Sequence, residues 1–263
     1  MLLQDKIIIV SGIGPGLGIA LALCAAKEGV KGIALAARTA EKLADAEQQI
    51  NALNLDIEVL KVPTDISKRE DCNNLIALTV EKWGRVDALI NSAYISGKFG
   101  PIEFADFADW RKTLDVNLFG SLQLSQAAIP SMKKHGGGAI VMVNSMVTRK
   151  SMPYQGGYAT SKGALSTATK SLAKEVGAYG IRVNSVFMGW MWGQNVKIYV
   201  KGAAKQRGVE EQVIIDEIVK EIPLGFIPTD VDCADPCIFL ASDQAKVITG
   251  ASLDINGGEY MPL

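Results

Sequence analysis

A serine, a tyrosine and a lysine stand close together between residues 144 and 162. Ser145 follows the apolar segment Ala139–Val143, and Tyr158 and Lys162 are four residues apart at the start of a long helical pattern. An apolar run of this length is typical of a strand that is buried on both faces, and side chains four apart share one face of a helix. The three groups therefore predict a site for moving a proton to or from an alcohol or carbonyl oxygen.

Tyr158 can exchange a proton near neutral pH only if its surroundings favour the phenolate, because the free pKa of tyrosine is about 10. An ammonium about 4 Å away favours the phenolate by about 4 kcal/mol at an effective dielectric constant of about 20. We therefore expect Lys162 to lower the pKa of Tyr158. A chance pair on an exposed helix is the alternative for Y-x-x-x-K taken alone, and the position of Ser145 argues against it.

Length and composition describe an ordinary globular chain. It has 263 residues, 48% of them hydrophobic and 21% charged, with a net charge of −1. We expect a large core, a cytoplasmic location, and neither a nucleic-acid nor a membrane partner. Histidine occurs once, at His135, and C-x-x-C is absent, so we expect no metal site. We interpret the four cysteines as buried thiols: Cys24, Cys72, Cys233 and Cys237.

Short apolar segments alternate with amphipathic ones along the chain. Strands are expected at 6–10, 33–37, 57–62, 88–90, 139–143, 181–186 and 252–255, and helices at 19–28, 39–53, 68–83, 110–135, 158–178 and from Thr229 to Ser242. This alternation predicts an α/β fold, a doubly wound, Rossmann-like parallel sheet of about seven strands with helices on both faces. Residues 190–228 are too long for a simple crossover, and we expect them to form a substrate lid within a single domain of residues 1–263.

A glycine-rich turn, S-G-I-G-P-G-L-G over residues 11–18, joins the first strand to the first helix. Its pattern is G-x-x-x-G-x-G, which differs from the usual dinucleotide fingerprint G-x-G-x-x-G. Backbone N–H groups in such a turn can bind phosphate, and a plain tight turn is the alternative. The residues that we expect to contact a dinucleotide cofactor here are Gly12, Gly14, Pro15, Gly16, Leu17 and Gly18.

The second strand ends with Ala37 and Arg38, where dinucleotide-binding folds place the group that contacts the adenosine ribose. An acidic residue there would bind the 2′-hydroxyl, whereas a guanidinium can bind a 2′-phosphate through two hydrogen bonds. We therefore predict a preference for NADP(H), with NAD(H) as the alternative. A solvated arginine is the competing interpretation of Arg38, and Pro15 weakens the prediction because proline has no N–H to donate.

Asn117 lies inside the predicted helix 110–135. Asparagine competes for backbone hydrogen bonds within a helix, so we expect a local perturbation that presents a polar group or a water to the site. An asparagine that faces solvent is the alternative.

Bulky side chains on the loops near the site suggest a bulky apolar or cyclic substrate. Packing of these side chains on one another is the alternative. The residues that we expect to line the substrate pocket are Tyr94, Ser145, Met146, Tyr154, Trp190 and Trp192.

These features together resemble the short-chain dehydrogenase/reductase family, in its form of about 250 residues. The resemblance covers nearly the whole chain and rests on S-G-I-G-P-G-L-G, N-S-A-Y, Y-A-T-S-K, V-N-S-V-F-M-G and I-T-G-A-S-L-D-I-N-G-G. It implies that Tyr158 is the general acid/base and that Ser145 hydrogen-bonds the reacting oxygen. Lys162 would hold the nicotinamide ribose and lower the pKa of Tyr158, and Asn117 would support a water path to Lys162.

The resemblance also implies an NAD(P)(H)-dependent oxidoreductase that interconverts a secondary alcohol and a ketone. Its sheet order would be 3-2-1-4-5-6-7, and it would assemble as a homotetramer. Further cofactor contacts implied by the resemblance are Asp65, Ile66, Asn91, Ser92, Ala93 and Gly189. Several positions depart from the family pattern: N-N-A-G is N-S-A-Y here, so that Tyr94 replaces a glycine, Met188 replaces a proline and Gly193 a threonine. Pro15 stands where NADP-preferring members of the family often carry a basic residue. The change at Gly193 puts in doubt one contact on the nicotinamide side.

Three other functions are alternatives to an alcohol/ketone oxidoreductase. A 3-oxoacyl carrier-protein reductase would need a basic patch near the site to receive an acidic carrier. A non-catalytic nucleotide-sensing protein on the same fold would be expected to lack the tyrosine or the lysine, and both are present. An enoyl reductase would space these two residues more widely than Y-x-x-x-K.

Overall fold

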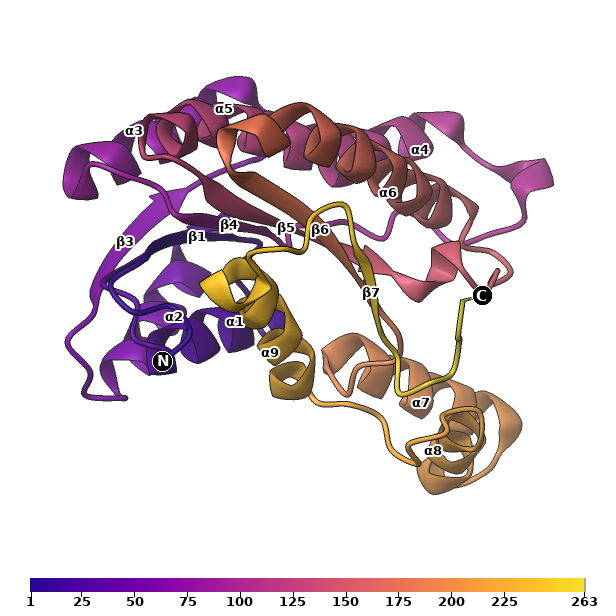
Figure 1. Cartoon of the computed structure of the whole chain (residues 1–263). Coiled ribbons are helices and arrows are strands. Elements are labelled where there is room, and N and C mark those ends of the chain that lie inside the picture. The colour runs from indigo at the N-terminus through magenta and orange to yellow at the C-terminus, as the bar shows by residue number, and fades with distance from the viewer. Residues whose placement is uncertain (263) are drawn as a thin grey trace.

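In the computed structural model, which describes residues 1–262, seven strands form one parallel sheet in the order β3-β2-β1-β4-β5-β6-β7 (Figure 1). The predicted fold and strand order are therefore confirmed. The strands are β1 (Ile7–Ser11), β2 (Gly32–Ala37), β3 (Glu58–Pro63), β4 (Ala88–Asn91), β5 (Gly138–Ser145), β6 (Ile181–Met188) and β7 (Ser252–Ile255).

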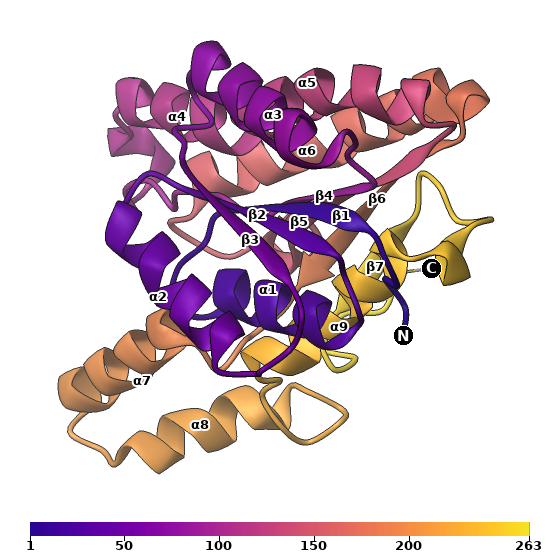
Figure 2. The same cartoon turned by 90° about the vertical axis from the view of Figure 1, so that its left-hand side faces the viewer.

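Helices cover both faces of the sheet, as Figures 1 and 2 show. On one face lie α1 (Leu17–Lys27), α2 (Ala40–Asn51) and α9 (Asp230–Ala241), and on the other lie α3 (Arg69–Trp83), α5 (Ser121–Lys134) and α6 (Gly156–Val176). The short helix α4 (Phe107–Leu114) precedes α5, while α7 (Gln194–Arg207) and α8 (Glu211–Lys220) follow β6.

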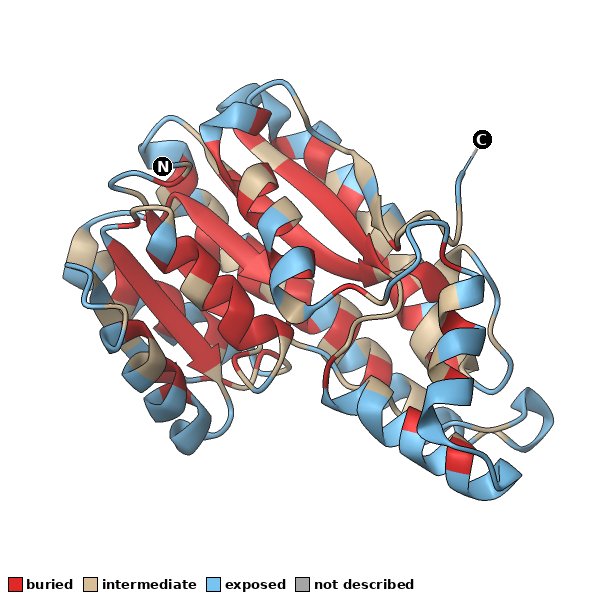
Figure 3. Ribbon diagram, turned by 90° about the horizontal axis from the view of Figure 1, so that it is seen from below, coloured by how far each residue is buried: buried red, intermediate tan, exposed pale blue. Residues whose placement is uncertain are grey.

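The core consists of two layers separated by the sheet. Ile8 and Val10 of β1 belong to the layer under α1 and α9, whereas Ile9 belongs to the layer under α3 and α5. Side chains alternate between the two faces of a strand, so a strand covered on both faces is apolar at every position. Figure 3 shows the sheet as buried along most of its length, which explains why the strands read as continuous apolar runs.

The predicted helix 110–135 is not one regular helix. It begins earlier, at Phe107, and a π-helical segment, Asp115–Gly120, separates α4 from α5. Asn117 lies within this segment, so the expected local perturbation of the helix is confirmed. Such π-turns occur frequently at functional sites.

Strands β5 and β6 extend further than the sequence predicted. Each has eight residues, and Ser145 pairs with Met188 at their carboxyl ends. Ser145 is therefore the last residue of β5, whereas the sequence predicted that it lies just past the strand end. The extension is possible because Asn144, although polar, is buried and uses its side-chain oxygen to accept a hydrogen bond from the Ser145 N–H at 3.0 Å.

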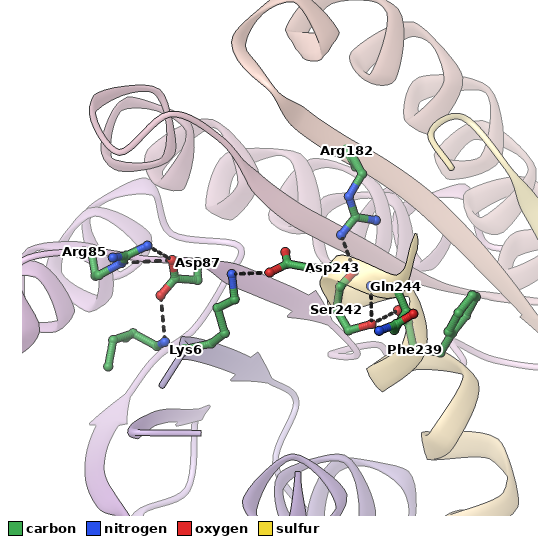
Figure 4. Close-up of polar contacts among 9 residues, drawn as sticks. Lys6, Arg85, Asp87, Arg182, Phe239, Ser242, Asp243 and Gln244 are labelled. Carbon is green, nitrogen blue, oxygen red and sulfur yellow. Dashed lines mark hydrogen bonds and ion pairs between the residues drawn. The ribbon is translucent and has the colours of Figure 1, made fainter. Parts of the chain in front are cut away.

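Polar groups at the amino ends of the strands are paired with one another (Figure 4). Asp87 accepts hydrogen bonds from the Ile7 N–H at 2.8 Å and from Arg85 Nε at 2.9 Å, and Lys6 forms an ion pair with Asp243 at 2.9 Å. Arg182 donates to carbonyl oxygens at the end of α9, at 2.8 and 2.9 Å. These contacts fasten β1, β4, β6 and α9 together at the edge opposite the predicted site.

Residues 190–228 contain α7 and α8, which pack against each other (Figure 1). A small apolar cluster holds them, with Val200 of α7 and Ile214 and Ile218 of α8 at its centre. Trp190 and Trp192 pack against this cluster from the segment that follows β6. The helix pair is thus a separate layer beside the carboxyl ends of the strands.

Candidate active site

A cleft of about 400 Å³ lies at the carboxyl ends of the strands. It brings together segments from both halves of the chain: the glycine turn, the end of β2, the segment after β4, the end of β5 and the start of α6. Predicted site residues that line it are Gly12, Gly14, Pro15, Gly16, Leu17, Gly18, Arg38, Asp65, Ile66, Ser92, Ala93, Tyr94, Ser145, Tyr158, Lys162 and Gly189.

Ser145 and Tyr158 meet where β5 ends and α6 begins. The Ser145 hydroxyl is a close neighbour of the Tyr158 phenol, and it accepts a hydrogen bond from the Val147 N–H at 3.3 Å. Two glycines set the position of Tyr158, because a Cβ at Gly156 or Gly157 would lie 2.7 or 2.9 Å from the ring of Trp110. The close approach of α4 to α6 therefore places the phenol opposite the strand end.

Lys162 is buried one turn along α6, with 3% of its surface exposed. Its ammonium donates a hydrogen bond to the Val143 carbonyl oxygen at 2.7 Å and lies 5.8 Å from the ring centroid of Tyr158. The ring centroid of Tyr94 lies 5.6 Å from the same nitrogen. One cation is thus held between two aromatic rings and the carboxyl end of β5.

Burial is the main cause of the shifted pKa values of Tyr158 and Lys162. It raises the pKa of Tyr158 above its usual value, with a smaller contribution in the same direction from Tyr94, and the hydrogen bond from Ser145 acts in the opposite direction. Burial also lowers the pKa of Lys162 to about 7. The lowered Tyr158 pKa predicted from the sequence is therefore wrong. That prediction included the attraction between Lys162 and the phenolate but not the desolvation of the two side chains.

Asn117 is fully buried, so the solvent-facing alternative is wrong. Its side chain accepts a hydrogen bond from the Ile95 N–H at 2.8 Å and donates to the Ile95 carbonyl at 2.9 Å. It also donates to the Ser161 hydroxyl at 2.9 Å, and that hydroxyl donates to the Tyr158 carbonyl at 2.7 Å. Asn117 therefore links the segment after β4 to the first turns of α6, while its part in a water path to Lys162 stays a prediction.

The glycine turn has the geometry of a phosphate-binding turn. A Cβ at Gly12 would lie 2.4 Å from the Ala93 nitrogen, and a Cβ at Gly18 would lie 2.2 Å from the Gly12 carbonyl oxygen. Gly16 has a φ of 97° and precedes α1, whose first turn carries no acidic side chain. The amino end of α1 therefore faces the cleft with backbone N–H groups and a positive dipole end, which suits the diphosphate of a dinucleotide.

Two cations lie at the β2 end of the cleft. Arg38 is exposed and lines the cleft, as expected, and Lys42 lines it as well. Sequence reasoning missed Lys42, which lies in the first turn of α2. Its side chain reaches the turn, where Cδ and Nζ lie 3.6 and 3.8 Å from the Cβ position of Gly14.

Asp65 and Asn91 are held by protein partners. Asp65 accepts hydrogen bonds from the N–H and hydroxyl of Ser67 at 3.1 and 2.7 Å. Burial acts to raise the pKa of this carboxyl, but the Ser67 hydrogen bonds outweigh it and the pKa is lowered. Asn91 is buried beside the cleft without lining it, and its amide donates to the Ser125 hydroxyl at 3.0 Å.

The residues predicted to contact substrate are only partly brought together. Tyr94 lines the cleft, and its hydroxyl accepts a hydrogen bond from Asn195 at 2.9 Å. Trp190 lines a neighbouring cavity of about 220 Å³ instead. Met146 is buried, Tyr154 is 62% exposed, and Trp192 packs on the α7–α8 cluster, so these three line neither space.

Met191, which we also expect from the sequence to lie on a pocket loop, and Gly193 line the cleft. Sequence reasoning missed four further residues that line it from α7 and α9, namely Gln194, Asn195, Val196 and Asp230. No local signal marked Asp230, because only the packing of α9 beside α1 brings it to the glycine turn. A glycine is required at position 189, because a Cβ there would lie 2.7 Å from the Cβ of Asn256.

No three His, Cys, Asp or Glu side chains within residues 1–262 are grouped so that they could hold a metal ion. The four cysteines are buried and free, in agreement with their interpretation as buried thiols. Among the described helices, none has the length and apolar character needed to cross a bilayer.

Comparison with known families gives a match over almost the whole chain. Residues 12–259 match a family model described as enoyl-(acyl carrier protein) reductase. An uncharacterised oxidoreductase of Thermotoga maritima is 32% identical over 255 residues, which cover 97% of each chain. A 3-oxoacyl-[acyl-carrier-protein] reductase of Staphylococcus epidermidis is 29% identical over 258 residues, or 98% of this chain and all of that one.

Solved structures also match over nearly the whole chain. L-Sorbose reductase from Gluconobacter frateurii, complexed with NADPH and L-sorbose, superposes with a TM-score of 0.93 at 26% identity, covering 100% of this chain and 99% of that one. NAD⁺-bound xylitol dehydrogenase gives 0.89 at 27% identity, covering 98% and 100%. The two relatives carry different cofactors, so similarity alone does not choose between NADP(H) and NAD(H).

Proposed function

The chain belongs to the short-chain dehydrogenase/reductase family, and we propose that it interconverts a secondary alcohol and a ketone with a nicotinamide dinucleotide. The observation that carries this proposal is that Ser145, Tyr158 and Lys162 line the same cleft as the glycine turn. The nicotinamide supplies or accepts the hydride when it is bound. The protein must then hold the carbonyl or alcohol oxygen and move one proton to or from it.

Tyr158 and Ser145 are the groups suited to that oxygen. The Tyr158 hydroxyl transfers the proton, and the Ser145 hydroxyl, which lines the same cleft, fixes the oxygen beside the phenol. Lys162 is held by the Val143 carbonyl on the same strand end, one helical turn from Tyr158 on the same face of α6. Asn117 acts as a positioning residue, because it links the Ile95 backbone to Ser161 in the Tyr158 helix.

The cofactor in this proposal is NADP(H) by preference, with NAD(H) as the alternative. Support comes from two cations, Arg38 and Lys42, that line the β2 end of the cleft. Ala37 precedes them, so β2 does not end in a carboxylate that would bind the ribose 2′-hydroxyl. A phosphate at the 2′-position would meet positive charge from both side chains.

The substrate in this proposal is bulky and apolar or cyclic. Support comes from the aromatic and apolar side of the 220 Å³ cavity beside the cleft, formed by Trp190, Tyr199, Met152, Ile214 and Ile218. The other side of this cavity is charged and consists of Lys150, Arg207, Glu217, Glu221 and Glu259. Trp190 and Tyr199 pack with their ring centroids 5.4 Å apart. Residues 190–228 would form the lid over this space, because α7 contributes to both the cleft and the cavity.

A second candidate is reduction of a 3-oxoacyl group on an acyl carrier protein, the activity in the name of the Staphylococcus relative. Lys197, Lys201 and Lys205 repeat every four residues on α7 and are exposed, so they share one face of the helix. No ion pair involves them within residues 1–262. An acidic carrier protein would bind this basic stripe, which lies beside the cleft.

The test is a screen of NADPH and NADH oxidation with cyclic, aromatic, steroid and acyl ketones, using Tyr158→Phe as the inactive control. Turnover of a free ketone supports the first candidate. Reduction of a carrier-bound 3-oxoacyl group much faster than of a small thioester, with that advantage lost in Lys201→Glu, would support the second. Dinucleotide binding without turnover of any ketone or thioester would instead favour the nucleotide-sensing alternative and contradict both.

A further inference from the structure

Asp230 is a carboxylate in the cleft that the proposed function does not use. It is the first residue of α9, and its position is fixed by a reciprocal cap around it. The Thr229 N–H donates to Asp232 Oδ2 at 2.8 Å, and the Asp232 N–H donates to Thr229 Oγ1 at 3.3 Å. The start of α9 is therefore rigid, and Asp230 points from it into the cleft lining.

The carboxylate lies between the glycine turn and the start of α7. Its Oδ1 is 3.4 Å from the Cβ position of Gly16 and 3.1 Å from that of Gly193. This oxygen is buried and has no hydrogen-bond partner within residues 1–262. A buried carboxylate oxygen without a partner is costly, so the site must compensate it in another way.

The positive end of the α1 helix dipole can compensate the charge of the Asp230 carboxylate. Gly16 is the residue before α1, and the first turn of that helix has no acidic side chain of its own. An anion at this place is stabilised by the helix dipole and by the backbone N–H groups that have no partner inside the helix. Asp230 therefore lies beside the glycine turn, which is where the diphosphate binds in the proposed function.

We propose that Asp230 opposes the diphosphate of the dinucleotide cofactor at the amino end of α1, so that cofactor binding is coupled to proton uptake by this carboxyl group. The proposal rests on the proposed function only in requiring that a dinucleotide binds at the glycine turn. Two negative groups cannot share one helix end without repulsion. Protonation of the carboxyl group removes that repulsion and lets the same oxygen atoms hydrogen-bond to the ligand.

The charged and titratable groups around Asp230 are few. Lys197 of α7 faces it and favours the carboxylate, while Cys233, one turn along α9, is a neighbouring thiol. Lys42 of α2 lies further along the turn, near Gly14. Burial raises the pKa of Asp230 and outweighs Lys197, and a second anion at this place would raise the pKa further.

The experiment measures NAD⁺ binding by isothermal titration calorimetry, because the diphosphate of NAD⁺ keeps its charge across the pH range used. Wild type is compared with Asp230→Asn and with Asp216→Asn, which removes an equal charge on α8 away from the cleft. We expect Asp230→Asn to bind NAD⁺ about tenfold more tightly at pH 7.5. Titrations in two buffers of different ionisation enthalpy should show proton uptake in wild type and Asp216→Asn but not in Asp230→Asn.

Unchanged or weaker binding by a folded Asp230→Asn, with proton uptake retained, would overturn the proposal and make Asp230 a plain hydrogen-bond acceptor. Failure of wild type to bind either NAD⁺ or NADP⁺ would instead refute the proposed function. If Asp230→Asn does not fold, wild type alone decides the question. Its affinity for NAD⁺ must then rise as the pH falls from 8 to 5, and a flat profile would contradict the coupling.

Discussion

The Lys162 ammonium donates to the Val143 carbonyl oxygen at 2.7 Å, two residues before Ser145 on the same strand. This bond fastens the second turn of α6 to the carboxyl end of β5, and so fixes the distance between the helix that carries Tyr158 and the strand that carries Ser145. Burial lowers the pKa of Lys162 to about 7, so the charge of this side chain changes near neutral pH.

Removing the Tyr158 hydroxyl should abolish turnover while leaving the cleft intact. A positioned general acid/base contributes about 10²–10⁴-fold, so we expect kcat of Tyr158→Phe to fall by about that factor or more. Cofactor Kd should change less than about threefold, because the glycine turn is untouched. Steady-state kinetics and a fluorescence titration measure the two quantities, and Ser145→Ala should lower kcat in the same way. Full activity in Tyr158→Phe would refute the assignment.

Replacing Lys162 with methionine should make stability less dependent on pH. The folded pKa of Lys162 is about 7, against an ordinary value of 10.5. Between these values the unfolded chain binds more protons at this residue than the folded chain, so the stability of wild type rises with pH through that window. The stability of wild type relative to Lys162→Met should therefore be lowest below pH 7 and increase toward pH 10.5.

Urea unfolding at several pH values measures this difference. Its full span is about 5 kcal/mol, at about 1.4 kcal/mol for each pH unit of the window. Loss of the hydrogen bond to Val143 adds an offset that does not depend on pH, so the slope is the test. A difference that stays constant from pH 6 to pH 10 would mean that Lys162 remains charged in the folded protein.

Cofactor preference should depend on the two cations at the β2 end of the cleft. We expect wild type to favour NADP(H), and Arg38→Ala to lower the ratio of kcat/KM for NADPH over NADH by about ten- to a hundredfold. Lys42→Ala should lower it by a smaller factor, because its ammonium is a single point charge. Lys31→Ala removes an exposed lysine outside the cleft and should leave the ratio unchanged. A wild type that prefers NADH would contradict this prediction.

Alanine at Gly156 should damage both stability and activity. Its Cβ would lie 2.7 Å from the ring of Trp110, so α6 or the ring must move. We expect a loss of about 1–3 kcal/mol and a lower kcat, since Tyr158 lies two residues further along. Gly163→Ala is the matched control in the same helix, where the new Cβ would meet, among the described residues, nothing within 4 Å beyond its chain neighbours and the backbone of its own helix. That variant should be more stable by about 0.5–1 kcal/mol, and equal effects of the two would disprove the steric argument.

The protein should be a homo-oligomer, as a tetramer is expected from the family resemblance. Several aromatic side chains near α4 and the π-helical segment remain exposed, with Phe104 at 80%, Phe107 at 55% and Phe119 at 51%. A surface of this kind is typical of an interface. Multi-angle light scattering should give about four times the chain mass of 28.1 kDa, and a monomer at micromolar concentration would contradict the expectation. Phe119→Asp should shift the assembly toward smaller species.

Much of the fold was determined by local sequence patterns. Strands such as β1 and β5 are apolar at consecutive positions because both faces are covered, and this pattern is visible without coordinates. The alternation of such runs with amphipathic segments led to the parallel sheet. The spacing of Tyr158 and Lys162 placed them on one helix face, since helical periodicity is a local property.

Tertiary structure decided what depends on distant segments. The pKa of Tyr158 is set by burial under surrounding elements, which outweighs the one neighbour visible in the sequence. Asn117 is buried because a π-turn directs it to the Ile95 backbone. Asp230 reaches the glycine turn only because α9 packs on α1, more than 200 residues away along the chain. Spacing along a chain determines which side chains share an element, whereas desolvation and the approach of two charges depend on how the elements pack.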